Sequence, residues 1–355
     1  MSDYWAAWDA FVEARPDTGF MQSSWWVEFR NYCGFDNFGL TLTDGDRLIG
    51  GAIVLKFMHA DDSCFYYIQD GPVLPRDPDL AEEVFGALRK AIDERRATES
   101  CTVSHLRIEP QWMSIPDFVT GFRGVAPLTD PYLEARDTRR VDLRVSEAEI
   151  LAQMKPKGRY NVGLARRQGV TVVEDTTTQG LADFQRLYKA TFARRRMKPK
   201  APDYFDALLS ALRSSGHGSL FFAEYAGIRL ATALVVYFGD RATYFFGGSA
   251  DLHRNVMAPE LLHFEIMRTA KRLGYAWYDL WGIAPPESAA NHAWRGFTQF
   301  KAKFGGDEIC LVPTLDYVYD PAAYERYTSL FRPTRHDSGT SIPVAFGLED
   351  SPAHL

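Results

Sequence analysis

The chain has 355 residues, of which 46% are hydrophobic and 24% charged, and its formal net charge is −6. This length suffices for one large or two medium domains, and the composition is that of an ordinary globular protein. No apolar run approaches the roughly 20 residues that span a bilayer, and the acidic N-terminus lacks the pattern of a secretory signal, so we expect no integral membrane segment and a cytoplasmic location. The four cysteines show no paired spacing, which argues against a metal site and against a disulfide framework.

The charge is distributed unevenly. Between Lys155 and Lys200 there are twelve basic and three acidic residues, a balance of +9, which leaves −15 for the rest of the chain. A basic segment inside an acidic protein is a candidate surface for phosphates. A solvated helix face can have the same composition, so charge alone leaves both interpretations open.

In chain order, the first half predicts helices, a hairpin, a strand, a helix and a strand. Apolar periodicity and turn residues place them at helices 4–15 and 24–32, strands 39–43, 48–57 and 64–69, helix 80–97 and strand 103–109.

The second half repeats this order at strands 220–225, 230–238 and 242–246, helix 259–273 and strand 277–283. The order is typical of the core of acyl-transferring enzymes, and a generic α/β core is the alternative.

An internal duplication accounts for the two similar runs. Setting Gly45 against Gly227 also sets Ile53-Val54 against Val235-Val236, and the order of the matches is kept over more than sixty residues. We therefore predict two similar α/β domains, 1–138 with 314–355 and 139–313. The segment from Thr314 is expected to pack on the first domain as a helix.

The loop before the helix at 259–273 lacks the glycines that an acetyl-coenzyme A site needs. Such a loop binds the cofactor pyrophosphate through backbone N–H groups at a helix N-terminus. Here it runs from Asp251 to Pro259 and contains Met257 and Pro259 where small or N–H-donating residues are wanted. This composition argues against acetyl-coenzyme A as the acyl donor.

Seven stretches in the same order resemble the Fem peptidyltransferases of the FemX type. Each is weak alone, and together they span residues 20 to 306: Gln22–Arg30, Tyr67–Pro72, Arg159–Val170, Thr191–Arg194, Gly247–Ser249, Tyr278–Ile283 and Phe300–Gly306.

The resemblance implies two tandem domains of the acyl-CoA N-acyltransferase (GNAT) type with a cleft between them and without the coiled-coil insertion of the FemA and FemB branch. It also implies transfer of an amino acid from aminoacyl-tRNA, a co-substrate in place of a cofactor, to an amine of a UDP-linked or lipid-linked muropeptide. In this interpretation the first domain binds the precursor and the second faces the tRNA. We expect no DNA partner and a monomer.

The resemblance implies three catalytic residues. Lys301, with its neighbour Phe300, matches the family lysine that stabilises developing charge or the leaving oxygen; a surface lysine on a solvated strand is the alternative. Glu109, at a predicted strand end, matches an acidic position and could accept the amine proton or orient the nucleophile. It replaces the family's aspartate, and a carboxylate paired with Arg107 is its alternative role.

Substrate-binding residues follow from the same resemblance. Arg30 and Arg194 match the basic residues that hold a nucleotide diphosphate, and Arg195 is included because the alignment can slip by one position. Tyr67, Tyr244 and Phe246 are placed along a peptide groove, although aromatic residues in such strands are often core residues.

The basic stretch is then assigned to the acceptor arm of tRNA. Its predicted contacts, mainly to phosphates, are Lys155, Lys157, Arg159, Arg166 and Arg167.

Three alternatives remain open at this stage. One is an aminoacyl-tRNA-dependent, amide-forming enzyme of natural-product biosynthesis, another is an acyl-CoA-dependent N-acyltransferase, and the third is a non-catalytic RNA-binding protein.

Overall fold

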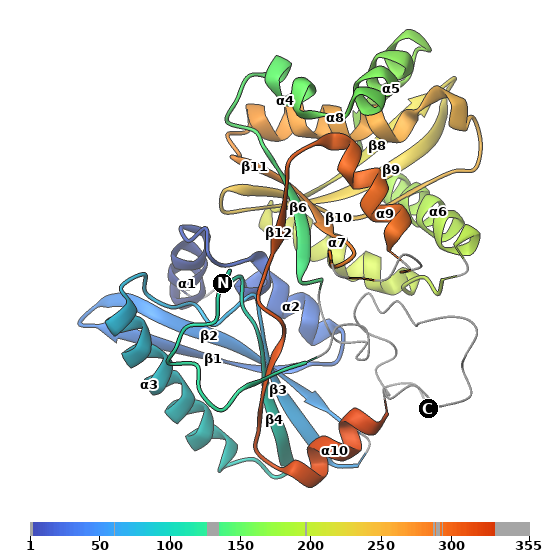
Figure 1. Cartoon of the computed structure of the whole chain (residues 1–355). Coiled ribbons are helices and arrows are strands. Elements are labelled where there is room, and N and C mark those ends of the chain that lie inside the picture. Colours follow the sequence, from blue (N-terminus) through green and yellow to red (C-terminus); the bar gives the residue numbers. More distant parts are fainter. Residues whose placement is uncertain are drawn as a thin grey trace. The chain divides into compact units, whose positions relative to one another are not determined.

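The computed structural model of the chain describes residues 3–59, 61–125, 135–195, 197–286, 288, 292 and 294–330. It has two compact units, each built on one β-sheet with helices (Figure 1). One unit comprises the residues up to Arg136 and those from Leu311 onward, and the other runs from Asp137 to Cys310. The predicted mixed α/β class is confirmed.

The first unit contains a six-stranded sheet in the order β1-β2-β3-β4-β13-β5. Its elements are α1 (Asp3–Glu13), η1 (Phe20–Gln22), α2 (Ser24–Tyr32), β1 (Asp36–Asp44), β2 (Arg47–Met58), β3 (Ser63–Gln69), α3 (Pro78–Arg96), β4 (Thr102–Glu109), β5 (Arg123–Gly124), β13 (Leu315–Val318) and α10 (Pro321–Ser329).

Strands β1 and β2 form the predicted hairpin, whose turn uses Gly45 at φ 58°. Helix α3 then joins β3 to β4, which pair in parallel. The helix begins after Asp77, whose side chain accepts a hydrogen bond from the backbone N–H of Leu80. Its apolar stripe, which includes Val84 and Leu88, packs on the sheet.

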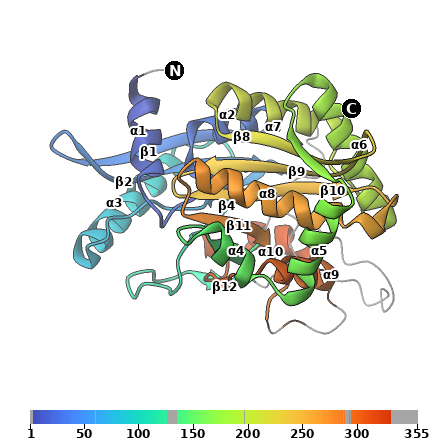
Figure 2. The ribbon, with the colours of Figure 1, turned by 90° about the horizontal axis from the view of Figure 1, so that it is seen from above.

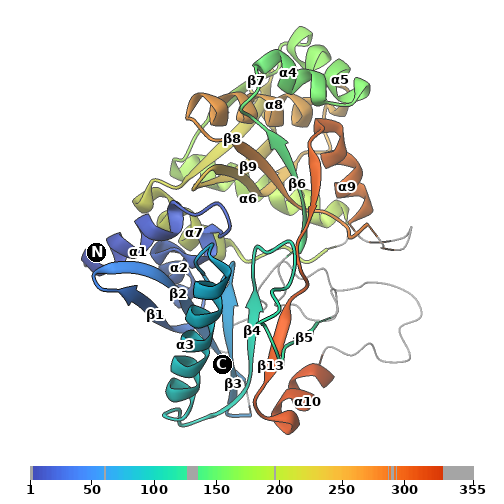
Figure 3. The same cartoon turned by 60° about the vertical axis from the view of Figure 1, so that its left-hand side comes forward.

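The expected helix of the C-terminal segment is wrong in its first part. Residues Leu315–Val318 form β13, which pairs antiparallel with β4, and the helix α10 begins only at Pro321 (Figure 3). The reason is burial of a charge: Asp316 on β13 forms an ion pair with Arg107 on β4, and both side chains are fully buried. A buried arginine needs a partner, and a strand beside β4 supplies one.

The second unit contains a seven-stranded sheet in the order β12-β6-β11-β10-β9-β8-β7. Its elements are β6 (Asp137–Asp142), α4 (Glu147–Gln153), α5 (Pro156–Arg167), β7 (Thr171–Glu174), α6 (Thr178–Arg194), α7 (Pro202–Ser215), β8 (Gly218–Tyr225), β9 (Ile228–Phe238), β10 (Arg241–Ser249), η2 (Arg254–Val256), α8 (Ala258–Arg272), β11 (Trp277–Gly282), α9 (Arg295–Lys301), η3 (Ala302–Phe304) and β12 (Asp307–Cys310).

Helices cover both faces of this sheet, which explains why its central strands are apolar on both sides. Helix α8 contacts β8 and β9 from one side, and α6 contacts β9 and β10 from the other (Figure 3). Along β9, Ala233 and Val235 belong to the same core cluster as Leu262 and Ile266 of α8. Helix α5 lies beside α8, as Figure 2 also shows.

The same run of elements therefore occurs in both units: a hairpin, a third strand, a helix and a parallel strand. It is β1-β2-β3-α3-β4 in the first unit and β8-β9-β10-α8-β11 in the second. Across the described residues the longest helix is α3, with 19 residues, so no paired helical insertion occurs there. Within the same ranges, no helix combines the length and apolar character that a membrane span requires.

Candidate active site

Lys301 is a buried residue at the end of α9, and its side chain is only 7% exposed. Its Nζ atom donates hydrogen bonds to the backbone carbonyls of Trp281 at 3.2 Å and Gly282 at 2.5 Å. Burial lowers the pKa of Lys301 to about 7, against an opposing effect of the nearby Asp279 carboxylate. The alternative of a surface lysine on a solvated strand is wrong on both counts.

An aromatic and imidazole shell surrounds this lysine. The Nζ atom lies 5.9 Å from the ring centre of Tyr244, and that ring stands edge-on to His263 of α8 at 4.5 Å. His263 Nδ1 is hydrogen-bonded to the Tyr278 hydroxyl at 2.7 Å. Burial lowers the pKa of His263 to about 3, so this imidazole is neutral at pH 7. Phe300 contacts His263 at 5.5 Å between ring centres and so forms part of the same shell.

The lysine lies where two parallel strands stop pairing. Strands β10 and β11 are paired through Arg241–Thr243 and Trp277–Asp279. Beyond that point β10 continues to pair with β9, whereas β11 contains a bulge and pairs with β6 at Gly282. Lys301 reaches the β11 carbonyls and the Tyr244 ring of β10 in this region. A cationic side chain thus occupies the opening between two strands, in a site of low polarity where its charge acts strongly.

Glu109 ends β4 in the first unit and is held by two hydroxyl groups. The Tyr67 hydroxyl donates to one carboxylate oxygen, and Thr314 Oγ1 donates to the other at 2.7 Å. Arg107, the partner considered from sequence, forms a buried ion pair with Asp316. The carboxylate of Glu109 is half-buried and lies at a strand end, where sheets of this kind place functional groups.

Arg30 is the buried member of the predicted phosphate-binding set, with an exposed fraction of 3%. It lies in the last turn of α2, and its guanidinium carbon is 4.0 Å from the ring centre of Phe35. Among the described residues, no partner accepts a hydrogen bond from its Nε atom.

Arg194 and Arg195 lie in the second unit and are exposed. Arg194, at the end of α6, donates to the carbonyl of Ser249 at 3.1 Å and to its hydroxyl at 3.2 Å. Arg195 stacks on Phe297 of α9, with its guanidinium carbon 3.8 Å from the ring centre. Both arginines therefore lie at the C-terminal end of α6, where Arg194 contacts β10 and Arg195 contacts α9, the helix of Lys301.

The three predicted groove aromatics have different environments. Tyr67 is buried and bound to Glu109, and Tyr244 is half-buried beside Lys301. Phe246 is buried and packs against Phe205 and Tyr188 of the helices that cover the sheet. Its surroundings are those of a core residue.

The predicted tRNA contacts are exposed and lie on or directly before α5. Lys155 precedes the helix, and Lys157 and Arg167 lie at its two ends. Two members also have structural roles: Arg159 donates to the carbonyls of Met154 and Ala152, and Arg166 pairs with Glu265 at 2.7 Å.

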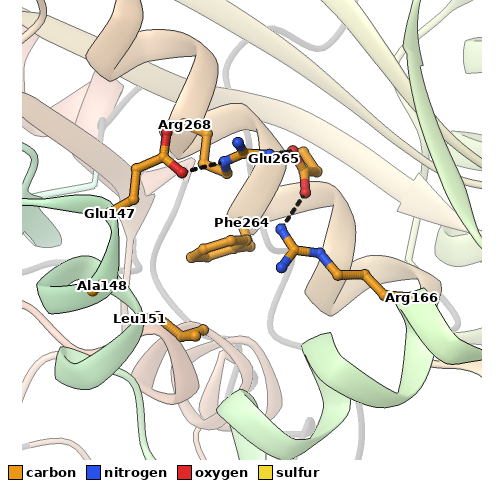
Figure 4. A pocket seen from close by; sticks show the side chains of 7 residues that line it. All are labelled: Glu147, Ala148, Leu151, Arg166, Phe264, Glu265 and Arg268. Carbon is orange, nitrogen blue, oxygen red and sulfur yellow. Dashed lines mark hydrogen bonds and ion pairs between the residues drawn. The ribbon is translucent and has the colours of Figure 1, made fainter.

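A shallow pocket of about 560 Å³ lies between α4, α5 and α8 in the second unit (Figure 4). Its rim is a chain of ion pairs in which Arg166 and Arg268 share Glu265, and Arg268 also pairs with Glu147, each at 2.7 Å. Phe264 lies between these charges (Figure 4). Because the charges neutralise one another, this pocket is a poor candidate for an ionic substrate.

Sequence reasoning missed several residues near Lys301. His263, Tyr278 and Asp279 were not assigned roles, although Tyr278 and Asp279 lie in one of the seven matched stretches. His263 could have been found from the sequence, because it is a polar residue within the apolar stripe of a helix, between Leu262 and Ile266. Asp279 was missed because the bulge in β11 that follows it could not be predicted from the sequence.

Comparisons with known proteins agree over almost the whole chain. The FemAB family model matches residues 6–114, 120–224 and 219–332. The lipid II:glycine glycyltransferase of Staphylococcus saprophyticus is 21% identical over 387 aligned positions, which cover 90% of this chain and 92% of that protein. The enzyme of the same name from Staphylococcus aureus is 20% identical, with 89% and 92% covered.

Solved structures agree with the fold. The crystal structure of FemX has a TM-score of 0.82 at 19% identity, and covers 92% of this chain and 99% of its own. The C-terminal domain of a putative lysylphosphatidylglycerol synthetase from Agrobacterium fabrum has a TM-score of 0.53 at 18% identity, with 92% and 96% covered. The predicted fold of two tandem acyltransferase-like domains is confirmed. With a family match that extends over both units, the chain belongs to the FemAB family.

Proposed function

We propose that this protein transfers an amino acid from aminoacyl-tRNA to an amine of a peptidoglycan precursor during cross-bridge formation, in the cytoplasm. The family membership and the names of its glycyltransferase relatives support the reaction class. The observation that carries the proposal is Lys301, a buried cation at the opening between β10 and β11. The acceptor is a UDP-linked muropeptide or its lipid-linked form.

The reaction is the aminolysis of an ester. The acceptor nitrogen attacks the aminoacyl carbonyl carbon, an oxyanion forms, and the C–O bond to the tRNA ribose breaks as the amide forms. The amine loses one proton and the ribose oxygen gains one. Protonated Lys301 stabilises the developing negative charge, and its low-polarity surroundings strengthen that interaction.

Glu109 is suited to act on the amine that loses a proton. Its carboxylate accepts hydrogen bonds from Tyr67 and Thr314, which fix its orientation. A fixed carboxylate at a strand end can orient the attacking amine or take its proton. We assign this role to Glu109 as part of the proposal.

The acceptor's diphosphate is assigned to Arg30 and Arg194. Arg30 supports this because its guanidinium is buried against aromatic rings and, within the described ranges, its Nε atom has no hydrogen-bond acceptor. A buried cation of this kind is stabilised by a phosphate oxygen. Arg194 is exposed, and its hydrogen bonds to Ser249 fix the orientation of its guanidinium group.

The tRNA is assigned to the exposed basic side chains of α5. Lys157 and Arg167 carry the clearest case, because they project into solvent and enter no ion pair recorded among the described residues. Binding would be dominated by phosphates and would weaken steeply as salt rises.

The N-terminus of α8 argues against the acyl-CoA alternative. Glu260 in the first turn is 4% exposed and accepts hydrogen bonds from Asn161 and Lys303, each at 2.9 Å. Its carboxylate already interacts with the positive end of the helix. A pyrophosphate bound there would meet this negative charge, so aminoacyl-tRNA is the better donor.

The test uses the purified chain, a mixture of radiolabelled aminoacyl-tRNAs and a UDP-linked muropeptide. Transfer of label to the muropeptide supports the proposal and names the amino acid. A parallel reaction offers a peptide or nucleoside acceptor in place of the muropeptide, and label that moves only in that reaction favours the natural-product alternative. Failure with every donor, together with acyl transfer from an acyl-CoA, would overturn the proposal.

A further inference from the structure

The carboxyl end of β11 has an unusual backbone conformation. Trp281 has φ 59°, in the left-handed region that a large side chain rarely adopts. The conformation lies within a bulge of β11 between Asp279, the last residue paired with β10, and Gly282, where the pairing of β11 with β6 resumes. Backbone strain of this kind persists only where surrounding interactions impose it.

Asp279 supplies those interactions. One carboxylate oxygen accepts a hydrogen bond from the backbone N–H of Trp281 at 2.8 Å and another from the Thr138 hydroxyl. The second oxygen accepts from Arg140 Nε at 2.9 Å. Asp279 is 1% exposed, so its carboxylate interacts with this turn and with Arg140 rather than with solvent.

The left-handed turn at Trp281 orients the two carbonyls that accept hydrogen bonds from Lys301. With Trp281 in the left-handed region, the carbonyls of Trp281 and Gly282 both accept hydrogen bonds from Lys301 Nζ. A fully extended β11 would alternate these two carbonyls to opposite edges of the strand. The bulge is therefore what lets one ammonium group reach both.

The charged and titratable groups that face Lys301 come from three elements. Asp279 lies on β11, Tyr244 on β10 and His263 on α8, and Tyr278 of β11 is hydrogen-bonded to His263. The two tyrosines and the histidine are uncharged at pH 7, because burial raises the pKa of both tyrosines and lowers that of His263. Among the described residues, Asp279 is the anion that favours the protonated form of Lys301.

We propose that Asp279 is a positioning residue for Lys301, which it acts on through the left-handed turn at Trp281 and through its own negative charge. The assignment rests on the proposed function, since it concerns the lysine that stabilises charge in that reaction. Asp279 itself contacts no substrate in this scheme.

The test is Asp279→Asn, which keeps the shape and removes the charge and one acceptor. We expect kcat for aminoacyl transfer to fall about 100-fold, as for a small misplacement of a catalytic group, with KM for aminoacyl-tRNA within about twofold of wild type. The protonated form of Lys301 is the active one, so wild-type activity should decline as pH rises through about 7. In Asp279→Asn this decline should move to lower pH.

A second readout does not depend on turnover. Titration of the Lys301 side chain by 13C NMR, with the signal assigned from its loss in Lys301→Met, should give a lower pKa in Asp279→Asn than in wild type. If the wild-type chain transfers no aminoacyl group, the proposed function fails while this titration still tests the positioning role.

Asp142→Asn is the matched control. Asp142 lies on the neighbouring strand β6 and pairs with Arg144 at 2.7 Å, at the surface. It should leave both kcat and the Lys301 titration unchanged. Thr138→Val removes one hydrogen bond to Asp279 and decides the matter if Asp279→Asn does not fold; we expect a loss in kcat of about three- to tenfold. A folded Asp279→Asn variant with a wild-type Lys301 titration would overturn the proposal, even if its kcat fell. A folded Thr138→Val variant with a wild-type kcat would also overturn it.

Discussion

The two units contain the same pair of parallel strands, and the pairs end differently. In the first unit β3 and β4 stay paired to their carboxyl ends, from Ser63 opposite Thr102 to Gln69 opposite Glu109. In the second, β10 and β11 stop pairing after Thr243 and Asp279, and Lys301 lies beyond that point. A closed ladder leaves no room for a reacting group between its strands, whereas an open one does. We infer that the first pair presents groups at its edge and that the second holds the charge-stabilising lysine.

The buried charges of the two units make the same contrast. In the first, Arg107 and Asp316 form a complete ion pair. The Tyr324 hydroxyl also donates a hydrogen bond to Asp316, and Arg107 donates one to the Tyr327 hydroxyl. In the second, the ammonium of Lys301 is bound by neutral carbonyls. A satisfied pair stabilises a fold, whereas a buried cation without a direct counter-ion can respond to charge on a substrate.

The largest effect should come from Lys301→Met. Removal of this amine should reduce kcat of transfer about a thousandfold, because charge in the transition state loses its stabilising group. Single-turnover transfer from labelled aminoacyl-tRNA measures this.

The same variant should remain folded, and should be more stable than wild type at pH 6, because the pKa of Lys301 falls from its ordinary 10.5 to about 7 on folding. Wild-type stability therefore increases as pH rises from about 7 to 10.5, and the advantage of Lys301→Met should shrink over that range. Near-normal turnover would remove Lys301 from the mechanism.

Asp316→Asn should have the next largest effect, on stability. It leaves the buried Arg107 without its counter-charge, which costs on the order of 3 kcal/mol. The midpoint of urea unfolding, followed by tryptophan fluorescence, checks this. The exposed pair Asp142–Arg144 provides the control, since Asp142→Asn should cost less than about 1 kcal/mol. If the folded fraction of Asp316→Asn lost transfer activity as Lys301→Met does, the contrast between the units would be wrong.

Glu109→Gln should reduce kcat/KM for the muropeptide about 100-fold, because a carboxylate that orients the amine or takes its proton becomes a neutral amide. The amide oxygen can still accept a hydrogen bond from one of the two hydroxyl groups, and the amide NH2 can donate to the other, so the fold should be retained. Affinity for aminoacyl-tRNA, measured by filter binding, should stay at the wild-type value. An equal loss of both would mean that Glu109 has a general structural role.

The smallest effect is expected from the double variant Lys157→Glu and Arg167→Glu. Each reversal removes a phosphate contact, so tRNA affinity should fall at least about tenfold and the slope of log affinity against log salt should decrease by about 2. Arg166 is left intact because its ion pair with Glu265 has a structural role. Muropeptide binding serves as the control. An unchanged salt slope would mean that α5 does not bind the tRNA.

Much of this molecule follows from local sequence. The positions of the hairpins, α3 and α8 could be predicted because apolar periodicity, turn glycines and proline at a helix start act over a few residues. The family motifs drew attention to Lys301 and Glu109, and the catalytic roles of both residues stay predictions. Exposed charges on α5 were likewise evident from composition.

Only the tertiary structure decided which partners those residues contact and whether they are buried. Lys301 is buried against the carbonyls of Trp281 and Gly282, and Asp279 links the backbone of Trp281 to Thr138 and Arg140, some 140 residues earlier in the chain. The strand at Leu315–Val318 likewise forms because Asp316 pairs with the distant Arg107. Local propensity determines where helices and strands begin, but burial of a charge is settled by partners far away in sequence, so a single sequence does not specify it.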